Sequence, residues 1–147
     1  MSQIVQDGDG YVIELAGWEL NSCTADRFNV FLDFACYRED QPEEHSYLAV
    51  GGALSVELPD GRHELQTTSP DEFGPLLSLL RGEVRHASVD AHGTLEITLS
   101  TGAIEIQPHA EFEAWDLMTP GFKVVCMPGG DLAIWDGPQP THGLGAE

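Results

Sequence analysis

The sequence is poor in positive charge. Its 147 residues include only 6 lysines and arginines against 25 aspartates and glutamates, which gives a formal net charge of −19, and Lys123 is the single lysine. The negative electrostatic field of such a chain repels nucleic acids and anionic membranes, because proteins bind both mainly through Lys and Arg. We therefore expect no nucleic-acid or membrane partner. The same field speeds encounter with a basic protein, although it can also serve solubility alone.

Long apolar runs are also missing. No stretch approaches the ~20 consecutive apolar residues that a transmembrane helix needs. Met1 is followed by Ser-Gln-Ile-Val-Gln-Asp-Gly-Asp, without the basic and apolar regions of a signal peptide, which favours a cytoplasmic location. The length predicts one domain, over residues 1–137. Residues 138–147 have no apolar pattern and are predicted to form a flexible C-terminal tail.

Cysteines are few, and the usual catalytic motifs are absent. Cys23, Cys36 and Cys126 form no Cys-x-x-Cys pair, so we expect buried free thiols. The sequence holds no HExxH, GxSxG, Walker loop or GxGxxG. These observations predict a protein that is not an enzyme and that needs no cofactor.

Two tryptophans, Trp115 and Trp135, bracket a stretch around which the rest of the chain is expected to be organised. Thr-Pro-Gly and Pro-Gly-Gly separate three short apolar runs, and both triplets are typical of turns. This pattern predicts an antiparallel meander that is buried on both faces and forms the core. The three runs are residues 115–118, 123–127 and 131–135.

Most of the remaining chain alternates between apolar and polar residues, as strands do. One helix is predicted over residues 70–81, because Ser69, Pro70 and Glu72 form an N-terminal capping signal and apolar residues follow at helical spacing. The predicted fold class is therefore α+β, with mostly antiparallel meander sheets and one amphipathic helix packed on a face. The apolar residues of that helix are Phe73, Leu76, Leu77 and Leu80, and the further strands are expected near residues 4–5, 11–16, 28–37, 47–50, 53–58, 63–67, 83–89, 94–99 and 103–107.

Two segments resemble each other at a spacing of 41 residues. Residues 54–66, LSVELPDGRHELQ, align with residues 95–107, LEITLSTGAIEIQ. The similarity predicts two hairpins of the same design. It could reflect an internal duplication, or two hairpins that follow the same strand and turn rules independently.

Two groups of side chains are candidates for function. The loop between residues 38 and 46 is strongly polar, and aromatic residues flank it, so it could bind a basic partner protein; the alternative is a merely solvated loop. The second group alternates in PHAEFEAW and would share one face of an extended strand, where it could hold a divalent metal or a small ligand, or simply face solvent. The first group is Tyr37, Glu39, Asp40, Glu43, Glu44 and Tyr47; the second is His109, Glu111 and Glu113.

The C-terminal part resembles a family of small, acidic, uncharacterised bacterial proteins that are common in actinomycetes. The resemblance rests on residues 113–117 (EAWDL), 124–130 (VVCMPGG) and 132–135 (LAIW), together with the turn at Gly102 and the strand after it. The family has no established activity. Its small acidic members look like immunity and accessory proteins found near bacterial toxin genes, which implies a basic, toxin-like partner.

Overall fold

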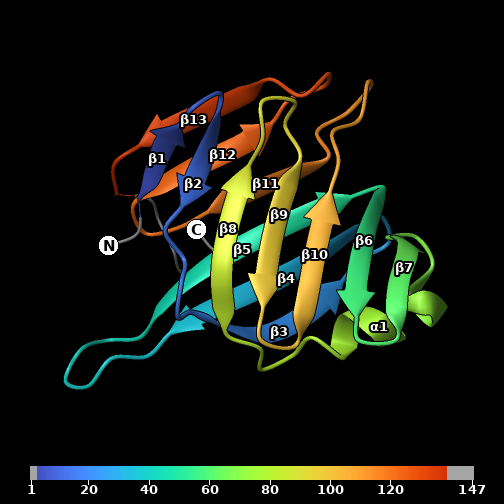
Figure 1. Cartoon of the computed structure of the whole chain (residues 1–147), viewed down its shortest axis with the longest axis horizontal. Helices are drawn as coiled ribbons and strands as arrows, with labels where there is room; N and C mark the ends of the chain where they lie inside the picture. The colour runs from blue at the N-terminus through green and yellow to red at the C-terminus, as the bar shows by residue number, and fades with distance from the viewer. Residues whose placement is uncertain (1–2, 139–147) are drawn as a thin grey trace.

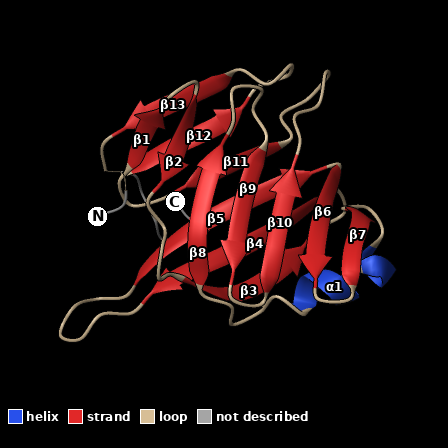
Figure 2. Ribbon diagram, in the orientation of Figure 1, coloured by secondary structure: helices blue, strands red, loops and turns tan. Residues whose placement is uncertain are grey.

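The computed structural model describes residues 3–138, and within them the chain forms two antiparallel sheets packed face to face (Figures 1 and 2). The strand order of one sheet is β1-β2-β8-β9-β10-β6-β7, and that of the other is β13-β12-β11-β5-β4-β3. The seven-stranded sheet contains β1 (Ile4–Asp7), β2 (Gly10–Ile13), β6 (Ala53–Leu58), β7 (Gly61–Gln66), β8 (Val84–Val89), β9 (Leu95–Leu99) and β10 (Gly102–Ile106). The six-stranded sheet contains β3 (Glu19–Ala25), β4 (Asn29–Cys36), β5 (Glu44–Gly51), β11 (Trp115–Met118), β12 (Phe122–Cys126) and β13 (Leu132–Asp136).

Along the described residues the chain passes between the sheets after β2, after β5 and after β10. The crossing after β5 takes place at Gly52, whose φ of +96° suits glycine and few other residues. The hydroxyl of Thr67, at the end of β7, fixes this crossing: it accepts a hydrogen bond from the Gly52 N–H at 2.9 Å and donates one to the Phe28 carbonyl at 2.8 Å. The break between the strands expected near residues 47–50 and 53–58 is therefore the point where the chain passes from one sheet to the other.

The core lies between the sheets and follows from the alternation of the strands. In β9, for example, Leu95, Ile97 and Leu99 are buried while Glu96 and Thr98 are exposed. Alternate residues of a strand point to opposite faces, so each sheet contributes its apolar face to one hydrophobic cluster. The opposite faces of both sheets carry the polar side chains that are candidates for function.

The predicted meander between the tryptophans is confirmed as the hairpin-linked strands β11, β12 and β13. The prediction that it is buried on both faces is wrong for β13, which is an edge strand. Trp115 is 1% exposed and donates its indole N–H to the Gly93 carbonyl at 3.0 Å, whereas Trp135 is 51% exposed. Leu132 and Ile134 pack against the core, so Trp135, which alternates with them along β13, points to the outer face of the sheet, beside Lys123.

The predicted amphipathic helix over residues 70–81 is wrong in its extent. The segment forms a 3₁₀ turn at Pro70–Glu72 and a single α-helical turn, α1, at Gly74–Leu77. Pro75 has no N–H and cannot continue the hydrogen bonding of the 3₁₀ turn, so α1 begins anew at Gly74, and after Ser78 the hydrogen bonds join residues three apart. The buried side chains accordingly recur every three residues, at Phe73, Leu76 and Leu79, and Leu77 is 48% exposed.

The cysteines agree only in part with the expectation of buried thiols. Cys126 is buried, while Cys23 and Cys36 are half-buried, and all three are free. Burial raises the pKa of the Cys23 and Cys126 thiols, which disfavours the reactive thiolate.

The described part of the chain has no helix of the length and apolarity that a membrane crossing requires. The predicted flexible tail falls, apart from Pro138, outside the described residues.

Candidate functional site

The acidic loop predicted from the sequence forms the end of a long hairpin between β4 and β5, which extends away from the sandwich at the lower left of Figure 1. A turn closes the hairpin, with a hydrogen bond of 3.3 Å from the Gln41 N–H to the Arg38 carbonyl. Asp40 sits in this turn with φ of +63°, a conformation that Asp tolerates better than most residues. Glu39, Asp40 and Glu43 are exposed, so the hairpin presents a concentrated negative charge to solvent.

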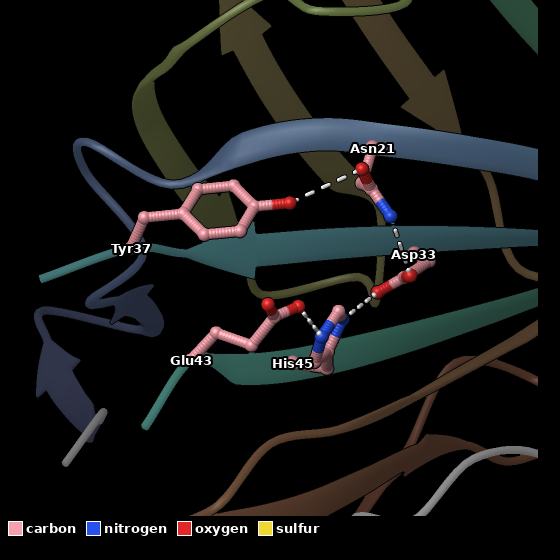
Figure 3. A network of polar contacts seen from close by, with 5 residues as sticks. All are labelled: Asn21, Asp33, Tyr37, Glu43 and His45. Carbon is pink, nitrogen blue, oxygen red and sulfur yellow. Dashed lines mark hydrogen bonds and ion pairs between the residues drawn. The ribbon is translucent and has the colours of Figure 1, made fainter. Parts of the chain in front are cut away.

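A chain of polar contacts lies at the base of this hairpin, on the outer face of the six-stranded sheet (Figure 3). The Tyr37 hydroxyl donates to the Asn21 Oδ1 at 3.3 Å, and the Asn21 amide donates to the Asp33 Oδ2 at 3.1 Å. The His45 ring then joins two carboxylates, with Nδ1 2.8 Å from the Asp33 Oδ1 and Nε2 2.6 Å from the Glu43 Oε2. The contacts link β3, β4 and β5 and hold the two legs of the hairpin together.

The electrostatics of this network favour a protonated histidine. Partial burial by itself would lower the pKa of His45, but the hydrogen bonds with Asp33 and Glu43 outweigh it, and the net shift is upward. An imidazolium can donate from both ring nitrogens, which two facing carboxylates require. The base of the hairpin is therefore bridged by a histidine ring that both neighbouring carboxylates bind.

The six residues predicted to bind a partner are only partly brought together. Tyr37 and Glu43 belong to the network, and the Tyr47 ring stacks on His45 with 6.0 Å between ring centroids. Glu39 and Asp40 lie at the exposed end of the hairpin. Glu44 differs: its Oε1 is buried and finds no hydrogen-bond partner among the described residues.

Sequence reasoning missed Asn21, Asp33 and His45, although they connect the predicted residues. Asp33 carried a usable signal, because it is the one charged residue within the alternating stretch of residues 29–36 and falls on its polar side. Asn21 carried none, since it sits where the register between β3 and β4 shifts at a bulge.

The three residues predicted as metal ligands lie in a loop between β10 and β11 and not on a strand, so the expected common face does not form. The His109 ring accepts a hydrogen bond at Nδ1 from the Glu111 N–H at 3.0 Å and stacks on Phe112 with centroids 3.8 Å apart. Within residues 3–138 no three His, Cys, Asp or Glu side chains are grouped so that they could hold a metal ion. Glu113 and Glu111 are both exposed.

His109 does line a hollow of about 340 Å³ on the outer face of the seven-stranded sheet. We call this hollow, together with an adjoining one of about 220 Å³, the Arg62 groove. The two parts share Ser55, Arg62 and Glu105, and so the groove continues across β7, β6, β10 and β9. Side chains that line it include Ser55, Arg62, Glu64, Glu105, His109 and Phe112.

The Arg62 guanidinium is fixed in the middle of this groove. Its Nε donates to Glu64 and its Nη2 to Glu105, both at 2.8 Å, and Nη2 also donates to the Ser55 hydroxyl at 3.0 Å. The hydroxyl in turn donates to Glu64 at 2.6 Å. The hydrogen bond from Ser55 and then that from Arg62 lower the pKa of Glu64, and the two carboxylates raise that of Arg62. The floor of the Arg62 groove therefore consists of hydrogen-bond donors and acceptors that hold one another in place.

A family model described as a family of unknown function (DUF6188) matches residues 13–136. The chain belongs to this family. The resemblance to a family without known activity, inferred from the C-terminal third, is thus confirmed at that level and extends over most of the chain. No curated protein and no solved structure matches it.

Both surfaces of this DUF6188 protein fall inside the matched residues, and they differ in chemistry. The hairpin is exposed and acidic, with aromatic rings at its base, and suits contact with a large basic surface. The Arg62 groove is concave and carries both signs of charge, and suits a small polar ligand.

Proposed function

We propose that this protein is a non-catalytic interaction domain, of immunity or inhibitor type, that binds a basic protein partner through the β4–β5 hairpin. The observation that carries the proposal is the combination of a projecting acidic hairpin with the polar network that braces its base. A braced hairpin loses little conformational freedom on binding, so more of the interaction energy remains as affinity.

Charge and aromatic contact have separate parts in this proposal. Glu39, Asp40 and Glu43 supply a field that steers a basic partner toward the hairpin. Tyr37 is 55% exposed while its hydroxyl is tied to Asn21, and so it offers a ring already held in place. Tyrosines of this kind are frequent anchors of protein interfaces.

The test compares two variants with the same change in net charge. One neutralises the hairpin (Glu39→Gln, Asp40→Asn, Glu43→Gln), and the control neutralises three acids outside the hairpin (Glu57→Gln, Glu83→Gln, Glu96→Gln). Each is used with the wild type to capture proteins from the source cells, and any captured basic protein is purified and its affinity measured by calorimetry. We expect the wild type and the control to bind it and the hairpin variant to bind at least about tenfold more weakly. Equal binding by all three, or capture of no basic protein, would contradict the proposal.

Several finer expectations belong to the same proposal. They are a bacterial, actinomycete-type origin, a cytoplasmic location, a toxin-like partner, and retention by relatives of the C-terminal motif that includes VVCMPGG and the following LA-x-W. Genomic neighbourhood tests them together, because a toxin gene beside the gene for this chain is expected under this proposal and a metabolic operon is not.

A second candidate function is the binding of a small ligand, and the Arg62 groove favours it. His109, predicted from the sequence for this purpose, lines the groove, whereas Glu111 and Glu113 do not. The divalent-metal form of this candidate has a direct test in elemental analysis of the purified protein and a thermal-shift screen with divalent ions. Absence of both metal and shift removes it.

A further inference from the structure

The Arg62 groove has the size and the rigid lining of a small-molecule site. Its larger part, of about 340 Å³, is within the range of ligand pockets, roughly 300–1,000 Å³. The side chains on its floor hold one another: Arg62 is bonded to Glu64, Glu105 and Ser55. Groups fixed in this way bind a ligand without first having to be ordered.

The floor of the groove also has hydrogen-bonding groups that its internal contacts do not use. The contacts of Arg62 use Nε and Nη2, and no described residue pairs with its Nη1 group. Glu105 binds Arg62 through Oε1, which leaves its second oxygen as an acceptor, and the Gln107 amide lines the same hollow. The groove therefore presents at least one strong donor beside strong acceptors.

One wall of the groove is aromatic. The His109 ring stacks on one face of Phe112 with an interplanar angle of 14°, and Phe112 remains 39% exposed. The Phe112 ring rests on Gly52, where a Cβ atom would come within 2.9 Å of it. An aromatic face beside polar groups suits a ligand with one apolar face and several polar edges.

Charge narrows the class of ligand. Glu57 and Glu96 also line the groove and have no ionic partner among the described residues, so an anion is repelled. A cation gains little in the larger hollow, because its two carboxylates, Glu64 and Glu105, are already bound to Arg62. An apolar molecule would bury charged groups without replacing their hydrogen bonds with water. A neutral molecule with several hydroxyl groups avoids all three disadvantages, because each hydroxyl both donates and accepts.

We propose that the Arg62 groove binds a neutral saccharide, with the C–H face of one sugar ring on Phe112 and its hydroxyl groups on Arg62, Glu105 and Gln107. This proposal rests on the second candidate function, the binding of a small ligand, and is independent of the hairpin.

The test is an NMR titration of the ¹⁵N-labelled full chain with sugars that share a ring shape but differ in charge. The neutral probes are glucose, galactose, mannose, maltose and cellobiose; glucosamine is the cationic probe and glucuronate the anionic one. We expect at least one neutral sugar to shift amide signals of β6, β7, β10 and the loop before β11, with weak affinity. Tighter binding by glucosamine or glucuronate, or no shift at the groove with any neutral sugar, would overturn the proposal.

Variants identify the residues responsible. Phe112→Ala and Glu105→Gln are each expected to weaken binding by about tenfold, while Phe28→Ala, which removes an exposed ring outside the groove, leaves it unchanged. An amide spectrum that otherwise matches the wild type shows that each variant is folded. Unchanged binding by folded Phe112→Ala contradicts the placement of the ring. A fragment screen, read from the same spectra, distinguishes the saccharide proposal from the broader ligand-binding function. If only another class of small molecule shifts the groove signals, the saccharide proposal is wrong but the ligand-binding function stands.

Discussion

Glu64 and Glu105 occupy equivalent positions in two similar hairpins, and both bind the same guanidinium, that of Arg62. The hairpins are β6–β7 and β9–β10, and they lie side by side because β10 pairs with β6. The similarity noticed at a spacing of 41 residues thus has a structural consequence: repetition of one hairpin places two glutamates within reach of one arginine. Duplication and shared strand rules explain this arrangement equally well.

Arg62→Gln tests how far the seven-stranded sheet depends on this cation. Glu96 and Glu105 are directly opposite each other on neighbouring strands, and like charges in such positions repel. Removal of Arg62 leaves that repulsion without compensation, so we expect the melting temperature to fall by a few degrees and high salt to restore much of the loss.

The matched control is Arg85→Gln, since Arg85 makes a single, longer contact of 3.6 Å with Glu83. That change should have little effect on thermal denaturation. Equal losses for the two variants, or a loss at Arg62 that salt does not reduce, would show that the guanidinium is not an electrostatic clamp.

The strands could be predicted from the sequence, but their neighbours could not. Alternation is a local property, so β4, β9 and the meander after Trp115 were recognisable from their own residues. The pairs β5–β11, β2–β8 and β10–β6 join segments far apart in the chain, and no local pattern encodes them. The exposure of Trp135 has a related cause, because it depends on which face of β13 packs on the other sheet.

The candidate sites show the same limit. Tyr37, Glu43 and His109 were predicted because they stand in unusual local patterns. Asn21, Asp33 and Arg62 gain their importance from partners on other strands, which only the sheet brings close. The helix failed for a different reason: the apolar spacing of residues 73–80 also fits 3₁₀ turns, and Pro75, which has no N–H, divides the predicted helix into short turns.

Gly129 and Gly130 offer a matched pair for testing turn packing. Both have positive φ, +90° and +104°, but a Cβ at Gly129 would meet nothing, whereas one at Gly130 would overlap the His92 carbonyl. Gly129→Ala should cost about 1–2 kcal/mol of unfolding free energy from backbone strain alone. Gly130→Ala should cost roughly 1–3 kcal/mol more, because the turn before β9 must move. Urea denaturation measures both, and equal costs would contradict the close approach of the two turns.

Ser46 and Thr67 test the opposite effects of unpaired and paired buried hydroxyls. Both are almost fully buried, but the Ser46 Oγ has no partner in the described part of the chain, while the Thr67 Oγ1 bonds Gly52 and Phe28. Thr67→Val keeps the shape and should lower the unfolding free energy by roughly 1–3 kcal/mol. Ser46→Ala removes a hydroxyl that gains nothing and should change it by no more than about 1 kcal/mol. Chemical denaturation distinguishes the two, and a large loss for Ser46→Ala would reveal a partner for that hydroxyl.

Trp135 should dominate the accessible tryptophan fluorescence. Trp18 and Trp115 are 3% and 1% exposed, whereas Trp135 is 51% exposed. Acrylamide should therefore quench one component of the wild-type emission efficiently, and Trp135→Phe should abolish that component without loss of stability. Strong quenching that persists in this variant would mean that one of the two core tryptophans is accessible.

His45 should make stability depend on pH in a defined direction. Its pKa in the folded protein is raised above the ordinary value of 6.5, because the hydrogen bonds with Asp33 and Glu43 outweigh partial burial. The folded state therefore binds the proton more tightly than the unfolded chain does. The stabilisation is complete below about pH 6.5 and is lost as the pH rises through the folded pKa. Denaturation curves across this window should show the wild type losing stability relative to His45→Gln.

NMR titration of the His45 ring provides the direct measurement, with Asp33→Asn as the control. That variant removes one carboxylate and keeps the size of the side chain, so the pKa of His45 should fall toward its ordinary value and the pH dependence of stability should weaken with it. The pKa of His45 and the pH dependence of stability should change together, because both reflect how strongly the two carboxylates favour the protonated ring. If His45 titrates at or below its ordinary pKa while the hairpin stays ordered, the ring does not bridge the two carboxylates, and the brace proposed for the hairpin lacks its central contact.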